Sequence, residues 1–304
     1  MASAISPDDG RCCEASAPRR AAPGLIWFPL ACVLPLVVLM LGFFLWPLVG
    51  AIVNSFHPYS LAGINTAHWT LANYRTLLDP FYLGVLWRTV RISFLISLIT
   101  AVLAYPVAWY ATRLRPTAQA YLLILYVAPW LVNVAVKAFG WTVLLSPRGL
   151  INRSLMSLGL VDSPLPLMFN ETGVVIGLVH AHFMFVLLPL WAALGGIDRN
   201  LLWAASGLGA TGSAVFRSIV LPLTLPALLA GMIINFTINM AAFATPALLG
   251  GSRVQVVSTL AYRINLVDLN WPLGAAMALV LLAVTLGLVL AAQRLGTGRR
   301  EASA

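Results

Sequence analysis

The sequence predicts an all-α polytopic membrane protein with six transmembrane helices. Of its 304 residues, 61% are hydrophobic and only 9% are charged, and the mean hydropathy is +0.92. Soluble globular domains carry about 25% charged residues, so the composition argues against that class. The chain also contains six apolar stretches of at least the length, about 20 residues, that a helix needs to cross a bilayer.

The N-terminal part of the chain contains a polar tail and the first two spans. Residues 1–23 are polar and are predicted to be a disordered cytosolic tail. Residues 24–53 form the first span, which is too long for a signal peptide and is not followed by a small-residue cleavage site. A loop rich in aromatic residues precedes the second span, residues 92–110, and Arg88 and Arg91 mark its outer edge.

Four more apolar stretches complete the predicted membrane domain, residues 24–293. They lie at residues 121–145, 173–196, 223–249 and 272–293. Residues 294–304 are then a short basic tail, predicted to be cytosolic. An even number of spans places both termini on one side of the membrane, and we find no internal repeat and no second domain.

One polar segment, residues 197–222, interrupts the apolar stretches between the fourth and fifth spans. Asp198 or Asn200 is a suitable N-cap for a short helix, and Gly209 stands where a glycine would close that helix. A second short helix is expected to stop at Pro222, since proline disrupts a helix interior. The segment therefore predicts two short helices at the membrane surface, with small residues facing outward as a docking element.

The spacing in this segment resembles the coupling loop of ABC-importer permeases. The family pattern is Glu-Ala-Ala, three residues, Gly, nine residues, Ile, one residue and Leu-Pro. This chain fits every position except the first, where Trp203 replaces the glutamate. The positions assigned to ATPase coupling are Asp198, Trp203, Ala204, Ala205, Gly209, Ile219, Leu221 and Pro222.

The resemblance implies a type I ABC importer-like fold with a cytoplasmic coupling helix between helices 4 and 5. It implies a bacterial inner-membrane complex with cytosolic ABC ATPases, a second permease subunit and an extracytoplasmic solute-binding protein, with both termini cytoplasmic. Residues 71–75, 77–82, 105–106 and 270–276 further resemble the spermidine/putrescine-type permeases. A polyamine-type solute is therefore favoured, while the same subgroup includes permeases for opines, ferric iron and phosphonates.

Nucleotide chemistry within this chain is not expected. Gly207-x-Gly209-x-x-Gly212 matches a dinucleotide fingerprint by letter, but a helix-like run precedes it where the motif requires a strand. Lys137 is the only lysine and lies in an apolar run, so a phosphate-binding Walker loop is absent. ATP-driven transport would need an ATPase on another subunit. We predict a protein that is not an enzyme and has no cofactor and no metal site.

The net charge of +9 does not point to nucleic acid, because arginines at helix ends reflect membrane orientation and contact with anionic lipid in the bilayer. An ATPase-independent secondary transporter or channel remains an alternative. A membrane enzyme would need clustered catalytic side chains, which the sequence does not offer.

A few polar residues inside the spans are candidates for the substrate pathway. Polar groups at membrane depth are costly unless they meet each other or water, so they should face the protein interior. Asn133 and Lys137 are four residues apart and so share a helix face, and the same holds for Asn235 and Asn239. The two histidines are only two residues apart and so diverge by about 200° around the helix. Helix packing and cavity lining are both open roles for these candidates, which are Asn133, Lys137, His180, His182, Asn235 and Asn239.

The spans contain no Asp or Glu, although a polyamine is a multiple cation. Strong selection of such a solute is therefore expected in the binding protein, with this chain forming a weakly binding path.

Overall fold

The computed structural model describes residues 24–60, 63–64 and 68–301. The predicted tail at residues 1–23 lies outside the described residues. The chain divides into two compact units, Met1–Gly50 and Ala51–Ala304, which are described separately. The first unit contains most of helix α1, Gly24–Ser55. From Val33 onward this helix is long and apolar enough to cross a membrane, and its side chains are largely exposed, as suits contact with lipid or a partner helix.

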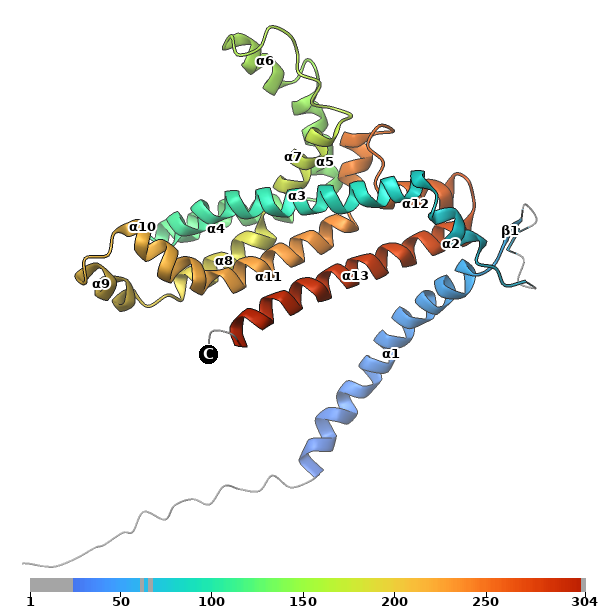
Figure 1. The fold of residues 1–304 in the computed structure, drawn as a ribbon, viewed down its shortest axis with the longest axis horizontal. Helices are drawn as coiled ribbons and strands as arrows, with labels where there is room; N and C mark the ends of the chain where they lie inside the picture. The colour runs from blue at the N-terminus through green and yellow to red at the C-terminus, as the bar shows by residue number, and fades with distance from the viewer. Residues whose placement is uncertain (1–23, 61–62, 65–67, 302–304) are drawn as a thin grey trace, which may run out of the picture. The chain divides into compact units, whose positions relative to one another are not determined.

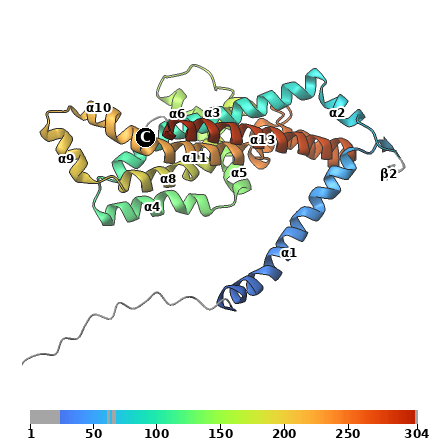
Figure 2. The same ribbon diagram turned by 60° about the horizontal axis from the view of Figure 1, so that its bottom comes forward.

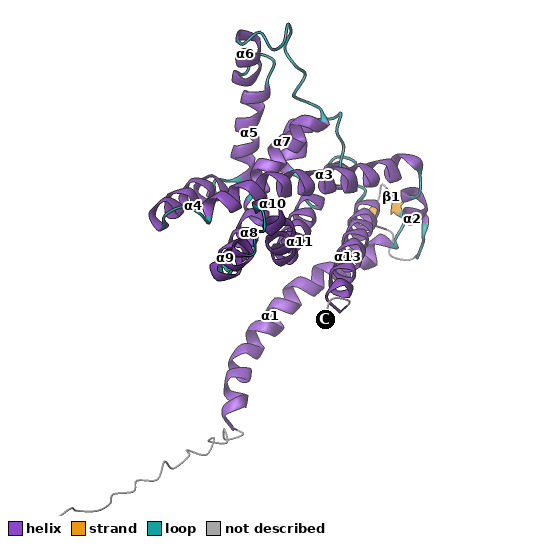
Figure 3. Cartoon of the chain, turned by 60° about the vertical axis from the view of Figure 1, so that its left-hand side comes forward, coloured by secondary structure: helices purple, strands orange, loops and turns teal. Residues whose placement is uncertain are grey.

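The second unit is built almost entirely from helices (Figure 3). A two-residue antiparallel pairing, with Tyr59 opposite Ile64, is the only strand structure among the described residues. In chain order the elements are β1 Tyr59–Ser60, β2 Gly63–Ile64, α2 Ala72–Leu77, α3 Pro80–Ala111, α4 Pro116–Leu131, α5 Val134–Leu145, α6 Leu150–Ser157, α7 Glu171–His182, α8 Met184–Gly195, α9 Arg199–Gly207, α10 Gly212–Val215, the π-helix η1 Phe216–Val220, α11 Leu221–Met240, the π-helix η2 Pro246–Gly250, α12 Val257–Leu266 and α13 Trp271–Glu301.

Helices α3, α8 and α11 pack against one another at the centre of this unit (Figure 1). The short helices α9 and α10 lie at one end of it, and α2 and the β1–β2 pairing lie at the other end (Figures 1 and 2). Helix α13 begins near α2 and runs back toward the α9–α10 end, packing against α12 and α11 on the way.

Small residues allow these central helices to approach closely. Ala104 and Ala108, one turn apart on α3, are fully buried in a cluster with Leu187 and Leu190 of α8. On α11, a Cβ atom added to Gly231 would lie 3.0 Å from the Cα atom of Val186. Small residues at helix contacts are typical of membrane proteins, because close backbone packing replaces the hydrophobic effect as the source of association.

The structure offers up to the six spans that were expected, but the third of them lies later in the chain than predicted, at Val134–Ser157 instead of residues 121–145. The described residues contain five helices long and apolar enough to cross a membrane, or six when α7 and α8 count as one span bent by 45°. The predicted third span, residues 121–145, is divided into α4 and α5. Pro129 is near the end of α4, and the side chain of Asn133 restarts the chain as α5 by accepting a 2.8 Å hydrogen bond from the Ala135 amide.

Several helix ends differ from the predicted span ends. Helix α3 begins at Pro80, because the Asp79 side chain accepts a hydrogen bond from the Phe81 amide at 2.9 Å and caps it there. The predicted fifth span is divided between α11 and η2. Helix α13 continues to Glu301, into the segment predicted as a tail.

Candidate functional site

The polar segment 197–222 forms α9, α10 and η1 at one end of the second unit (Figure 1). The Asp198 side chain caps α9 by accepting a hydrogen bond from the Asn200 amide at 2.9 Å, so Asp198 is the N-cap and Asn200 is not. Gly209 follows the last turn with a φ of +81°, a left-handed conformation that favours glycine. The predicted start and end of this helix are confirmed.

The prediction that a second short helix stops at Pro222 is wrong. After the cap at Thr211, α10 continues through η1 into α11, and Pro222 lies in the first turn of α11. In the π turn, the Leu221 amide donates to the Phe216 carbonyl, five residues back instead of four. This wider turn changes the hydrogen-bond register just before the proline, which lacks an amide hydrogen, so the chain can remain helical there.

Helix α9 has one exposed apolar face. Leu201, Ala204 and Leu208 follow the spacing of one helix face, and Leu208 is 90% exposed. Leu202 and Ala205 are half-buried, and Leu202 packs against the central cluster. Exposed leucines on one side of a short surface helix indicate a docking surface.

Trp203, which replaces the family glutamate, lies beside the end of α3. Its side chain is 68% exposed and lines a hollow of about 280 Å³ together with Trp109, Arg113 and Arg199. This position leaves most of the indole open to a partner while one part of it faces the end of α3.

Aromatic contacts connect the polar segment 197–222 to α3. The Phe216 ring meets the rings of Tyr105 and Trp109 edge-on, with centroid distances of 5.4 and 5.8 Å. The Tyr105 hydroxyl is hydrogen-bonded to the Thr224 hydroxyl of α11 at 2.9 Å. A displacement of the segment would therefore act directly on α3. Our reading of the sequence did not assign this role to Tyr105, although the Tyr-Pro pair in the second span was a visible signal.

The other coupling positions are distributed around the start of α11. Ile219 and Leu221 are half-buried and Pro222 is exposed.

Three of the six pathway candidates form a hydrogen-bonded chain between α7 and α11. The Asn239 side-chain amide donates to the Asn235 side-chain oxygen at 2.8 Å, and the Asn239 side-chain oxygen is 2.9 Å from Nδ1 of His182. Asn235 is fully buried, and its own side-chain nitrogen has no hydrogen-bond partner in the part of the chain that the structure describes. The predicted common face of the two asparagines is confirmed.

The remaining candidates lie around this chain without a direct bond to it. Nδ1 of His180 accepts a 3.2 Å hydrogen bond from the Trp141 indole nitrogen, so the two histidines face different partners as predicted. Lys137 is half-buried, makes no ion pair or hydrogen bond within the described part of the chain, and is close enough to act electrostatically on both histidines. Asn133 is exposed and caps α5.

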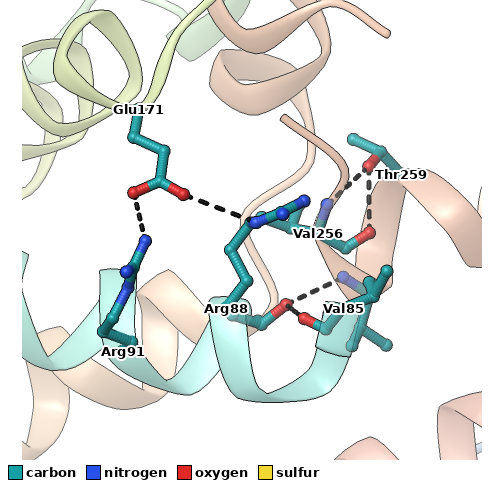
Figure 4. Close-up of polar contacts among 8 residues, drawn as sticks. Val85, Arg88, Arg91, Glu171, Val256 and Thr259 are labelled. Atoms are coloured by element: carbon teal, nitrogen blue, oxygen red, sulfur yellow. Dashed lines mark hydrogen bonds and ion pairs between the residues drawn. The ribbon is translucent and has the colours of Figure 1, made fainter. Parts of the chain in front are cut away.

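An ion-pair cluster that sequence reasoning missed connects α3 to the start of α7 (Figure 4). Nε of Arg88 lies 3.4 Å from one carboxylate oxygen of Glu171, and Arg91 donates to the other oxygen. Beside this cluster, the Thr89 hydroxyl accepts a hydrogen bond from the Val257 amide at 3.0 Å and so joins α3 to α12. The signal in the sequence was the pair Arg88 and Arg91, three residues apart, with Glu171 80 residues after Arg91.

No three or more His, Cys, Asp or Glu side chains gather to hold a metal in the region that the structure describes. The arrangement offers a docking surface at one end, a neutral polar chain within the helices and an ion-pair cluster near the other end. Such a layout suits passage of a solute between helices more than covalent chemistry.

Comparison with known proteins agrees with this layout. The family described as "Binding-protein-dependent transport system inner membrane component" matches residues 93–300. The spermidine/putrescine transport system permease protein PotB of Escherichia coli (strain K12) is 33% identical over 223 residues, which are 73% of this chain and 80% of that protein. The putative 2-aminoethylphosphonate transport system permease protein PhnU of Salmonella typhimurium is 28% identical over 289 residues, 90% of this chain and 93% of that protein.

Among solved structures, a chain of a bacterial ABC transporter that imports the acidic polysaccharide alginate has the same fold. It superposes with a TM-score of 0.75 at 19% identity and covers 90% of this chain and 96% of that chain. The family match extends over the coupling segment and the polar chain alike. This multi-pass membrane protein therefore belongs to the family of binding-protein-dependent transport system inner membrane components, the permease subunits of ABC importers.

Proposed function

We propose that this permease subunit forms, with a second permease subunit, the membrane path for a polyamine-type solute. In this proposal an extracytoplasmic binding protein delivers the solute, and cytosolic ABC ATPases drive its passage across the bacterial inner membrane. Residues 24–293 would be the six-helix permease domain. The observation that carries the proposal is the exposed apolar face of α9, inside a segment with the spacing of an ATPase-coupling loop.

In this role, one face of α9 would contact the ATPase and the other face contacts the central helices of this chain. Leu201, Ala204 and Leu208 would enter a groove on the ATPase, while Leu202 holds the helix to the central bundle. The edge-on contact between Phe216 and Trp109 would then pass the movement of the segment to α3. ATP binding acts in such a system by favouring one of two conformations through its differential affinity for them.

The same assignment orients the chain in the membrane. Helix α13 runs from the α2 end toward the α9 end (Figure 2). If α9 contacts a cytosolic ATPase, the C-terminus is cytoplasmic, and six spans make the N-terminus cytoplasmic as well.

The substrate path would use the polar side chains between α5, α7 and α11. Asn235, Asn239 and His182 offer neutral hydrogen-bonding groups where the surrounding helices are apolar. The one acidic side chain in the described spans is Glu171 at the start of α7, and it is already paired with Arg88 and Arg91. Weak, neutral contacts allow a polar solute to leave as well as enter, which leaves strong selection to the binding protein. Asn133, Lys137 and His180 would border this path.

The experiment is uptake of radiolabelled spermidine and putrescine into proteoliposomes that contain the chain with its partner permease, ATPase and binding protein. The proposal requires uptake that depends on both ATP and the binding protein. Uptake by this chain alone without ATP would overturn it in favour of a secondary transporter.

A phosphonate is the second candidate substrate, because one relative is named for 2-aminoethylphosphonate transport and because the half-buried Lys137 has no ion-pair partner among the described residues. The variant Lys137→Gln separates the two. Loss of the ammonium should leave polyamine uptake unchanged or raise it, since like charges repel. It should lower phosphonate uptake several-fold, because an attractive charge is removed.

A further inference from the structure

A hollow at the coupling end of the second unit carries positive charge that no ion pair among the described residues neutralises. It lies between the end of α3 and the α8–α9 connection, and its rim includes Trp109, Thr112, Arg113, Arg199 and Trp203. No acidic residue lines it. Neither arginine makes an ion pair within the described residues, where the two ion pairs present both involve Glu171.

Two polar side chains near the hollow, Asp198 and Thr112, are already occupied by local contacts. The Asp198 carboxylate accepts the Asn200 amide at 2.9 Å, so it serves as the cap of α9. The Thr112 hydroxyl donates to the Trp109 carbonyl at 3.0 Å. The Arg113 guanidinium lies 4.2 Å from the centre of the Trp109 ring, and a guanidinium stacked on a ring keeps its N–H donors free at the edge.

The position of the hollow matches the boundary between lipid and water. Arg113 follows the end of α3, a 32-residue apolar helix, by two residues. Tryptophan rings are enriched at this boundary, since one part of the indole is apolar and its N–H is polar. Basic pockets between helices at the cytosolic side of a membrane are suited to anionic lipid headgroups.

We propose that this hollow binds the phosphate of an anionic phospholipid of the cytosolic leaflet, held by Arg113 and Arg199 between the rings of Trp109 and Trp203. The choice of leaflet rests on the orientation in the proposed function. Trp109 lies in the last turn of α3 and Arg113 just after it, while Arg199 and Trp203 belong to α9, so a bound headgroup would bridge the bundle and the coupling helix. The coupling helix would then respond to the anionic lipid content of the membrane.

An acidic side chain of the ATPase is a less suitable occupant. The exposed leucines of α9, Leu201 and Leu208, provide the docking face for that partner, and neither of them lines the hollow. An ATPase carboxylate is therefore treated as an outcome of the test.

The test measures lipid binding to the purified full chain by native mass spectrometry, with phosphatidylglycerol and phosphatidylcholine as probes. The wild-type chain should retain phosphatidylglycerol in preference to phosphatidylcholine. A basic side chain near an anionic lipid surface contributes enough that Arg113→Gln or Arg199→Gln should each weaken phosphatidylglycerol binding about fivefold. Arg115→Gln is the matched control, because Arg115 is an exposed arginine two residues after Arg113, in the same connection between α3 and α4, and does not line the hollow. It should bind lipid as the wild type does.

A double variant carries both Arg113→Gln and Arg199→Gln. Equal phosphatidylglycerol binding by the wild type and this double variant would overturn the proposal. The proposal would also fail if Arg115→Gln weakened phosphatidylglycerol binding as much as Arg113→Gln or Arg199→Gln does. If the double variant bound lipid normally but no longer retained the ATPase, the hollow would be an ATPase contact. A Trp203→Glu variant adds a separate check, since a carboxylate beside Arg199 should compete with the phosphate and lower lipid binding at least as much as either arginine variant. Lipid binding is measured without transport, so a failure of the proposed transport function would be seen separately.

Discussion

The two arginine pairs of this protein, near opposite ends of α3, are held in different ways. Near its N-terminal end, Arg88 and Arg91 share the carboxylate of Glu171, so their charge is partly neutralised within the chain (Figure 4). At the other end, Arg113 lies on a tryptophan ring, and Arg199 across the hollow has no acidic partner among the described residues. We call the first arrangement closed, because its charges are paired within the chain and connect two helices. We call the second open, because its arginines have no acidic partner among the described residues, and we therefore expect it to bind a group outside the chain.

This contrast predicts which measurement each variant should change. Variants in closed networks, such as the Glu171 cluster or the His182–Asn239–Asn235 chain, remove a bond that already exists and should lower stability. Variants at the coupling end leave the fold intact and should lower transport.

Gly209→Asp should abolish transport and weaken ATPase association while the protein still inserts into the membrane. A non-glycine residue in the left-handed conformation costs roughly 1 kcal/mol, and a carboxylate at the C-terminal end of α9 meets the negative end of the helix dipole. ATP-dependent uptake and co-purification of the ATPase measure the effect. Gly207→Ala is the control, since that glycine is helical and a Cβ there meets open space. Wild-type uptake by Gly209→Asp would remove the coupling role.

Asn239→Ala should destabilise the protein by about 1 to 3 kcal/mol. The substitution leaves Nδ1 of His182 and the Asn235 side chain without their partner, and buried unsatisfied polar groups carry that penalty. Unfolding of the purified protein in a denaturing detergent series measures the change. Thr237→Ala on the same helix should have little effect, because that residue is exposed and its hydroxyl bonds only its own helix. Equal stability of both variants would show that the polar chain does not hold α7 to α11.

Trp203→Ala should lower transport more than Trp203→Glu. Alanine removes the indole from the hollow and leaves a gap beside α3, whereas glutamate restores the family residue and can pair with Arg113 or Arg199. Trp203→Glu should retain most of the transport rate. Initial uptake rates and stimulated ATPase activity rank the two variants. A higher rate for the alanine variant would show that the tryptophan does not act by packing.

Glu171→Gln should have the smallest effect, a loss of at most about 1 kcal/mol that shrinks at high salt. The carboxylate and both guanidinium groups are 38–52% exposed, and ion pairs at such positions are weak and screened. Thermal unfolding at low and high salt measures the loss. Arg148→Gln, at an exposed arginine that makes no ion pair in the described structure, is the control and should change nothing. A loss that persists at high salt would indicate that the closed network depends on more than charge.

Local signals in the sequence determined much of this protein. Hydropathy is a property of a continuous stretch, so the membrane-spanning class and the polar segment 197–222 could be predicted without knowing any contact. The ends of α9 were also predictable, because Asp198 caps amides two residues away and Gly209 adopts its φ within its own turn. The common face of Asn235 and Asn239 followed from the helical repeat alone.

Only the tertiary structure decided which distant groups meet. Arg91 and Glu171 are 80 residues apart, and His182 and Asn239 are 57 apart, so neither pairing is encoded in a local pattern. The π turn before Pro222 begins at Phe216, whose ring contacts Tyr105 and Trp109 on α3, more than 100 residues earlier in the chain. The open hollow arises in the same way, since Arg113 and Arg199 come together only where α9 folds back beside the end of α3. Side-chain partners across helices are set by packing, which couples residues that the sequence keeps far apart.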